Sequence, residues 1–373
     1  MLSLEQYALF LLSMKKKGKA VDLAHIEEKA KRDMGAPDSK AVQKALDILI
    51  ARGHVSKDGG DFMSTEAGRS HFRAEFPGIE GELRKVNEAW SLVYVAKNYY
   101  PEVAEEITTI CRDRYVGFFC VFTEEHFFRR KLGRNYITIK RPSDLLRLVD
   151  MHYVDVIPCV HRIGANRPDW LVIDLDAGRS VPFGEVRKAA RLTHRAMGEH
   201  DLEPALKFSG SRGFQVWAQL EDFRMPDQYK PMALPGGSDR APSFFSLYAD
   251  MIAYIEAQIR DKMDGRTTST VADKEKRENK ILLDASPMKE MGLVRSPYSL
   301  HHRTGLVSMP LAPEEIEAFD PSMARPENVL ARFRKRGNEF HLTARDPSRM
   351  VKSTLEWIQD NSGRAPGIRG QVT

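Results

Sequence analysis

The sequence has few cysteines. Only three occur among 373 residues, and no two of them are spaced as a CxxC pair. An odd number of cysteines without such a pair encodes neither a disulfide framework nor a tetrahedral zinc site. We therefore expect no structural zinc and predict that Cys111, Cys120 and Cys159 are buried thiols.

Long apolar runs are also missing. No stretch approaches the roughly 20 residues that cross a bilayer, and the first lysines follow the N-terminal apolar segment, which is the reverse of a secretory signal. With 42% hydrophobic and 29% charged residues, the composition is that of a globular protein. We expect a cytoplasmic protein of two or three domains, without a membrane partner.

A large excess of one charge sign is missing as well. The chain has 57 basic and 52 acidic residues, and its net charge of +5 is weak evidence for a polyanionic partner. The distribution is more informative, because residues 129–147 hold seven basic residues and one acid. This stretch could follow a nucleic-acid backbone or could be an ordinary solvated surface. The candidate nucleic-acid contacts are Arg129, Arg130, Lys131, Arg134, Lys140 and Arg141.

Residues 1–76 show apolar residues at helical spacing. They predict three helices followed by two short strands around an Asp-Gly-Gly turn. This order is typical of a winged helix-turn-helix, whose third helix can enter a DNA groove. The 13 basic and 11 acidic residues of this segment do not require DNA, so it could equally dock a protein.

Composition and predicted secondary structure change twice along the rest of the chain. A helical linker region is predicted over residues 77–114. From residue 115 on, short runs rich in β-branched and aromatic residues alternate with helical segments. We predict an α+β catalytic core with mixed or antiparallel sheets and flanking helices over residues 115–312, and a C-terminal helical segment over residues 313–373.

Two acids share one predicted strand. In DWLVIDLDAG, residues 169–178, Asp174 and Asp176 project from the same face, about 6 to 7 Å apart along the strand. Like charges this close favour a cation, and oxygen ligands suit Mg²⁺ or Mn²⁺. A second apolar strand, in ENKILLDAS, ends at Asp284, which could complete a three-carboxylate site. Alone, the DLD pattern is also common in turns and helix caps.

The stretch KFSGSRGFQVWAQL, residues 207–220, consists of two apolar runs joined by a turn. This turn contains more glycine and polar residues than a hairpin requires. One glycine would meet the geometric demand. Two glycines let a ligand approach the backbone, exposed amides in such a turn bind anions, and hydroxyl and guanidinium groups add donors. The turn is either a solvated corner or a phosphate clamp. Its residues are Ser209, Gly210, Ser211, Arg212 and Gly213.

A third polar stretch, VRSPYSLHHRTG, occupies residues 294–305 after Asp284. Its cationic and hydrogen-bonding groups suit a triphosphate, and Arg295, His301 and Arg303 are the candidates. Either histidine taken alone could equally be a satisfied core residue or lie on the surface.

In this order, the three stretches resemble the catalytic core of the archaeo-eukaryotic primase superfamily, especially the small catalytic subunit of archaeal and eukaryotic primases. Asp174 and Asp176 match the DxD motif of that family, and the turn matches its SGxRGxH motif. The third motif is the most specific. It is matched by Asp284, Arg295, Pro297, Ser299, His301, Arg303, Thr304 and Gly305.

The resemblance covers about residues 115–312. A fainter agreement links TEEHFF to an REFxF segment of the family, in which Glu125 corresponds to the acid and Glu124 stands in place of arginine. The chain departs from the family at Gln215, where the family has histidine, because glutamine keeps a donor but cannot carry charge or move a proton. It also lacks a zinc-binding insertion and adds the winged-helix-like segment.

The resemblance implies a DNA primase or primase-polymerase that joins nucleotides on a DNA template by a two-metal mechanism. Asp174, Asp176 and Asp284 would be the catalytic residues and would hold two divalent ions, Mg²⁺ or Mn²⁺. A single-stranded DNA template and an NTP or dNTP would be the partners, and a primase large subunit or a replication or repair protein is a further candidate. The triphosphate contacts would be Ser209, Gly210, Ser211, Arg212, Gly213, Gln215, Arg295, His301 and Arg303.

Two other functions stay open at this point. Repair polymerases fused to bacterial end-joining ligases also resemble the DLD and SGxxG motifs, although they lack the SLHxxTG stretch. A member of another class, a binding protein with a degenerate primase fold, would hold nucleic acid or nucleotide without turnover, and Gln215 is its main support. The three retained carboxylates favour an enzyme.

Overall fold

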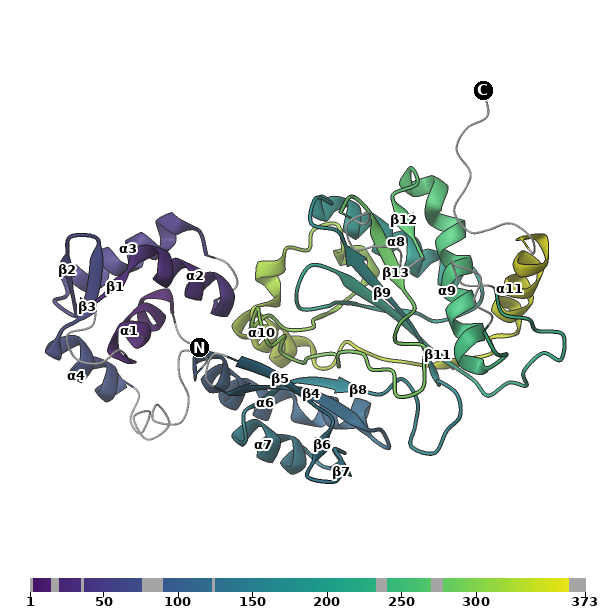
Figure 1. Cartoon of the computed structure of the whole chain (residues 1–373), viewed down its shortest axis with the longest axis horizontal. Coiled ribbons are helices and arrows are strands. Elements are labelled where there is room, and N and C mark those ends of the chain that lie inside the picture. The colour runs from purple at the N-terminus through teal and green to yellow at the C-terminus, as the bar shows by residue number, and fades with distance from the viewer. Residues whose placement is uncertain are drawn as a thin grey trace.

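The computed structural model describes residues 3–14, 20–34, 37–75, 90–122, 125–232, 240–269 and 278–361. Two groups of elements follow one another along the chain (Figure 1). Residues before 76 form a small lobe, and residues after 89 form a larger α+β body built on a seven-stranded and a three-stranded sheet, with a separate two-stranded ribbon, β6-β7, at residues 131–136.

The small lobe combines helices with a three-stranded antiparallel sheet of order β1-β3-β2. Helices α2 and α3 each begin after an aspartate that accepts a backbone N–H of the first turn. Tyr7, Phe10, Phe62 and Phe72 are buried in its core. Its elements are α1 (Leu4–Met14), β1 (Val21–Asp22), α2 (Leu23–Asp33), α3 (Ser39–Ala51), β2 (Val55–Asp58), β3 (Asp61–Ser64) and α4 (Glu66–Glu75).

The order of the three helices and the two-stranded ribbon in this lobe agrees with the sequence prediction. Strand β1 and helix α4 were not predicted. The winged-helix interpretation, and the division of the chain into four segments, stay predictions.

The first sheet of the larger body has the order β5-β4-β8 and is antiparallel. Helix α6 packs against β8 and α7, and its Pro101 lies inside the helix. The described part of the region predicted to be helical over residues 77–114 therefore contains one continuous helix of 22 residues. The elements are α6 (Trp90–Cys111), β4 (Val116–Phe122), β5 (Glu125–Arg129), β6 (Lys131–Leu132), β7 (Asn135–Tyr136), α7 (Pro142–Asp150) and β8 (Tyr153–Pro158).

The second sheet has seven strands in the order β12-β13-β9-β11-β10-β14, and β15 pairs in parallel with β11. Strand β9 lies at its centre, antiparallel to both neighbours. Helices α8 and α9 pack on this sheet, and α11 packs on α9. The strands are β9 (Trp170–Ala177), β10 (Ala205–Phe208), β11 (Phe214–Leu220), β12 (Thr267–Thr268), β13 (Ile281–Asp284), β14 (Pro310–Leu311) and β15 (Ala344–Arg345).

In the described part of the chain, four helices belong to the C-terminal half, and among them α10 contacts α6 of the other part of the body. They are α8 (Phe183–Gly198), α9 (Phe244–Arg260), α10 (Pro326–Arg336) and α11 (Ser348–Asn361), with short 3₁₀ turns at Asp261–Met263, Pro313–Glu315 and Pro321–Ala324. The predicted α+β class with mixed and antiparallel sheets is confirmed.

Two smaller predictions can also be compared with the structure. Cys111, Cys120 and Cys159 are buried, as predicted, and none forms a disulfide. No described helix is both long enough and apolar enough to cross a membrane.

Candidate functional site

A row of polar side chains crosses four strands of the large sheet. The strand register places Lys207 opposite Gln215, Gln215 opposite Asp174, and Asp174 opposite Asp284. Directly opposite residues share one face of a sheet, so these four side chains are neighbours in turn. Asp176 follows Asp174 by two residues and therefore projects from the same face. The three acids predicted from separate stretches are thus brought to one place.

Asp174 lies at the centre of this row. Burial and the charge of the nearby Asp284 raise its pKa to about 6, although Lys207 and a hydrogen bond from Gln215 oppose the shift. The carboxyl group is therefore short of positive charge. Such a group is stabilised by any cation that binds beside it.

Asp284 and Asp176 differ in their surroundings. Both oxygens of Asp284 accept hydrogen bonds from Ser286, at 2.8 Å from the amide and 2.7 Å from the hydroxyl, whereas Asp176 is exposed. In the part of the chain that the structure describes, no group of three or more Asp, Glu, His or Cys side chains is placed to hold a metal ion. Asp174 and Asp284 are therefore neighbours in the row, and Asp176 projects from the same face, but the three carboxylates do not converge on one point.

Lys207 ends the row and is fully buried. Its Nζ donates to the Ser308 hydroxyl at 2.5 Å and lies 5.3 Å from the centre of the Trp217 ring. Burial and the charge of Arg295 lower its pKa well below the ordinary value, whereas Asp174 acts in the opposite direction. A buried lysine facing carboxylates was not expected from the sequence.

The turn between β10 and β11 is closed at its base by a reciprocal pair of hydrogen bonds. The amide of Ser209 donates to the Gly213 carbonyl at 3.0 Å, and the Gly213 amide donates to the Ser209 hydroxyl at 3.2 Å. Gly210 has a φ of 89°, which favours glycine. A Cβ on Gly213 would lie 2.2 Å from the carbonyl oxygen of Leu175, so the turn packs directly on β9 between the two acids of that strand.

The tip of the turn carries unused donors. Within the described structure, the amides of Gly210, Ser211 and Arg212 make no backbone hydrogen bond. The Arg212 side chain is exposed and donates to the Ala177 carbonyl at 3.2 Å, beyond Asp176 at the end of β9. Consecutive free amides of this kind form a concave site for an anion.

His301 lies against this turn, because a Cβ on Gly210 would lie 3.0 Å from the His301 Cβ. Its Nδ1 accepts the amides of Arg303 and Thr304, each at 3.2 Å, which assigns the ring proton to Nε2. Burial and the charge of Arg295 lower the pKa of His301 to about 3, so the ring is a neutral donor. Arg303 is exposed beside it.

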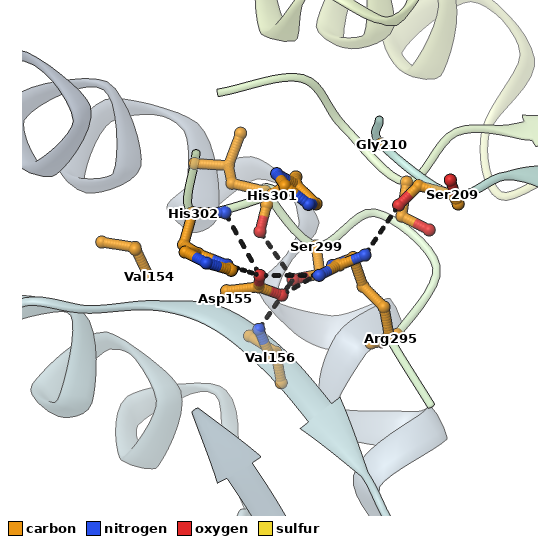
Figure 2. A network of polar contacts seen from close by, with 12 residues as sticks. Val154, Asp155, Val156, Ser209, Gly210, Arg295, Ser299, His301 and His302 are labelled. Carbon is orange, nitrogen blue, oxygen red and sulfur yellow. Dashed lines mark hydrogen bonds and ion pairs between the residues drawn. The ribbon is translucent and has the colours of Figure 1, made fainter. Parts of the chain in front are cut away.

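Arg295 is bound to protein on two sides. Its Nε and Nη2 donate to the two oxygens of Asp155 at 2.8 and 2.9 Å, and its Nη1 donates to the Ser209 carbonyl at 3.0 Å. Figure 2 shows Arg295 reaching from Asp155 to Ser209, with His302 on the other side of Asp155. Asp155 is fully buried on β8. Sequence reasoning missed it, although an acid inside the apolar run YVDVIP was a visible signal.

The basic stretch runs from β5, at the edge of the three-stranded sheet, through the two-stranded ribbon of β6 and β7. Arg129, Lys131 and Arg134 are exposed there, together with the aromatic rings of Phe127 and Phe128. Lys131 lies 4.5 Å from the centre of the Tyr136 ring, Arg130 donates to the Met291 carbonyl, and Arg141 pairs with Asp144. Glu124 and the side chain of Glu125 lie outside the described residues.

The fold and the site define a core of the primase-polymerase class. A family model described as "LigD, primase-polymerase domain" matches residues 97–340, which is more than half of the chain. The chain belongs to this family, and the archaeo-eukaryotic primase superfamily predicted from the sequence is confirmed. This membership makes the chain a nucleotidyltransferase of that superfamily.

The polymerase domain of Mycobacterium tuberculosis ligase D, solved in complex with DNA, has a similar structure. The TM-score is 0.55 at 20% sequence identity, and the match covers 65% of this chain and 89% of that one. The two chains share a fold. A search of curated proteins gives no match.

Proposed function

We propose that this chain is a template-directed polymerase that adds nucleotides to a DNA end at the row formed by Gln215, Asp174 and Asp284. The observation that carries the proposal is the position of this row beside a turn with three free amides. A nucleotidyl-transfer site needs carboxylates for divalent ions and donors for phosphates, and these occur here within one sheet.

The donor chemistry fits Mg²⁺ or Mn²⁺. Asp174, Asp176 and Asp284 offer only oxygen ligands, and burial together with the charge of Asp284 raises the pKa of Asp174, a shift that a bound cation would oppose. Divalent ions held there would lower the pKa of a 3′-hydroxyl and stabilise the negative charge that develops on phosphate oxygens. We propose these three residues as the metal ligands.

The turn and the segment that follows β13 would hold the triphosphate. The amides of Gly210, Ser211 and Arg212 and the Ser211 hydroxyl would donate to its oxygens, and Arg212 and Arg303 would add positive charge. His301 would donate through Nε2 as a neutral ring, so it would orient a phosphate without supplying a proton at neutral pH.

Gln215 occupies the middle of the row. Its side chain reaches Asp174, and its Oε1 accepts from the Trp217 indole at 3.3 Å. We propose that Gln215 orients the Asp174 carboxylate, because an amide in this place can donate to a carboxylate but cannot change its charge.

The partners of such an enzyme would be a DNA template and an NTP or dNTP. The template would lie along the exposed basic and aromatic surface around β5 to β7, where stacking on Phe127 and Phe128 would add to phosphate contacts. That the similar ligase D domain was solved with DNA supports a DNA partner.

Extension of an existing end and priming are two versions of this activity. Membership of the LigD family supports extension at a broken or gapped end. The SLHHRTG stretch around His301 is the specific observation that favours a primase instead. For that version, a primase large subunit is a further candidate partner.

The test is nucleotide incorporation on three DNA substrates: an unprimed single strand, a primed template, and a gap with a 5′-phosphate. With Mn²⁺ or Mg²⁺ we expect extension of primed and gapped DNA and at least a 10³-fold loss in Asp174→Ala, because no other residue replaces this ligand. Products on the unprimed strand would favour the primase. Nucleotide binding without any product would favour the non-catalytic binding protein and overturn the proposal.

A further inference from the structure

The two sheets of the larger body are joined at the site by one buried carboxylate. Asp155 lies on β8 of the three-stranded sheet, whereas the turn after β10 belongs to the seven-stranded sheet. Arg295 spans the distance between them (Figure 2). Arg295 is the side chain that bonds both Asp155 and the turn, so a change at Asp155 acts on the Ser209 carbonyl through Arg295.

Asp155 is saturated with donors. Besides the two bonds from Arg295, its Oδ2 accepts the amide of His302 at 3.1 Å and faces the His302 Nδ1 at 2.8 Å. The Ser299 hydroxyl adds a contact of 3.5 Å to Oδ1, and its Oγ accepts the Val156 amide at 2.7 Å. Burial alone would raise the pKa of Asp155, but Arg295 and His302 hold it well below its ordinary range, so the carboxylate is charged. The Asp155 to Arg295 pair is therefore a fixed, two-pronged ion pair.

The pair determines the direction of the turn. A trans peptide points its N–H opposite to its C=O, so Arg295, by holding the Ser209 carbonyl, turns the Gly210 amide away from itself. Thr304 donates to the Gly210 carbonyl at 2.5 Å and turns the Ser211 amide in the same manner. Two of the three free amides are thus oriented by side chains that lie behind the turn.

We propose that Asp155 is a positioning residue of the nucleotide site, which fixes Arg295 so that the turn at Ser209 presents its amides to the triphosphate. This inference rests on the proposed function, since it assigns the turn to phosphate binding. Asp155 itself touches neither nucleotide nor metal, and Arg295 acts on the turn from behind.

A purely structural role is the alternative, and the chain offers a matched control for it. Asp250 on α9 is also buried and pairs with Arg240, and it accepts the Tyr229 hydroxyl at 2.8 Å and the Met232 amide at 3.2 Å. Removing the charge of either acid leaves an arginine without its partner, so both variants should lose comparable stability. Only the Asp155 pair reaches the turn.

The experiment compares Asp155→Asn with Asp250→Asn in the full chain. The readouts are KM and kcat for the nucleotide on a primed template, the Kd of a fluorescent dNTP measured with Ca²⁺, and the thermal midpoint. We expect KM and Kd to rise roughly 10- to 100-fold in Asp155→Asn only. Without Asp155, Arg295 no longer fixes the Ser209 carbonyl, so the amides of the turn are no longer oriented toward the triphosphate. Arg295→Lys, which keeps the charge but not the planar fork, should reproduce this increase.

If both aspartate variants lose the same fraction of active protein while KM and Kd stay unchanged, the inference is overturned. The proposed function would remain intact. An inactive wild type that binds no dNTP would overturn both. If Asp155→Asn does not fold, Arg295→Lys decides the question by the same comparison of KM and Kd.

Discussion

At the scale of single residues, two aspartates of this site show opposite responses to burial. Asp155 is surrounded by donors and keeps its charge, whereas Asp174 faces Asp284 and has its pKa raised to about 6. The same desolvation acts on both, so the difference comes from the neighbours. An acid whose pKa is raised in this way costs stability at neutral pH, and strongly shifted groups of this kind are common at functional sites.

The first prediction concerns the stability cost of Asp174. Its pKa in the folded state lies above the unfolded value near 3.9, so its contribution to stability is fully present below pH 4 and is lost as the pH rises through about 6. Asp174→Asn should therefore raise the thermal midpoint of the metal-free protein at pH 7.5 by about 1–3 °C. Calorimetry in EDTA measures this shift.

The control is the same measurement at pH 4 and with Mn²⁺. At pH 4 the wild-type carboxyl is mostly protonated, so the advantage of the asparagine variant should disappear. Saturating Mn²⁺ should stabilise the wild type more than the variant. A variant that is less stable than the wild type at pH 7.5 in EDTA would contradict this account of Asp174.

At the scale of elements, the hairpin of β10 and β11 depends on one close approach. Gly213 begins the return into β11 where a Cβ would lie 2.2 Å from the Leu175 carbonyl oxygen, and backbone cannot yield as a side chain can. Leu175 lies between Asp174 and Asp176. Any displacement of the turn is therefore transmitted to the acids of β9.

Gly213→Ala should lower nucleotide incorporation at least 100-fold and destabilise the protein by about 2 kcal/mol or more, because the strands must separate at this point. Gly198→Ala is the matched control, since no atom lies within 4 Å of its added Cβ and it ends helix α8. It should leave activity unchanged and be neutral or slightly stabilising. Incorporation assays and chemical unfolding measure both, and an active Gly213→Ala enzyme would show that the turn tolerates displacement.

Local sequence patterns were sufficient to predict much of this site. The i, i+2 spacing of Asp174 and Asp176 on an apolar run predicted their common face, and the glycines of the turn predicted its tight geometry. The position of Asp284 beside Asp174 depends on the pairing of β13 with β9 across about 100 residues, which no local pattern encodes.

Other features of the elements were not predictable for the same reason. The run NYITIK, residues 135–140, has strand composition but forms a strand only at Asn135–Tyr136. Ile137 bonds two different segments, because its amide donates to the Arg130 carbonyl at 3.0 Å and its carbonyl accepts the Val116 amide at 2.9 Å.

Asp155 interrupts an apolar strand, which is visible in the sequence, but its partners Arg295 and His302 lie 140 residues or more along the chain. The acid could therefore be noticed locally, whereas its ion pair could not be predicted from a short window.

At the scale of the whole molecule, a net charge of +5 understates the local field. Exposed arginines lie on β5 and on the β6-β7 ribbon, in the segment of the chain that leads to β8 and Asp155. If a template strand lies there, its affinity must fall with salt in proportion to the phosphates that are neutralised.

The last prediction is therefore a change in salt dependence. Replacing Arg129 and Arg134 by glutamine should reduce the slope of log affinity against log salt for single-stranded DNA by about 1.4, or about 0.7 for each lost phosphate contact. Arg195 and Arg349, which are exposed and pair with Glu199 and Asp201, are the matched controls. Their glutamine variants should keep the wild-type slope. Fluorescence anisotropy between 50 and 200 mM salt measures all three proteins, and equal slopes in all of them would place the template on another surface.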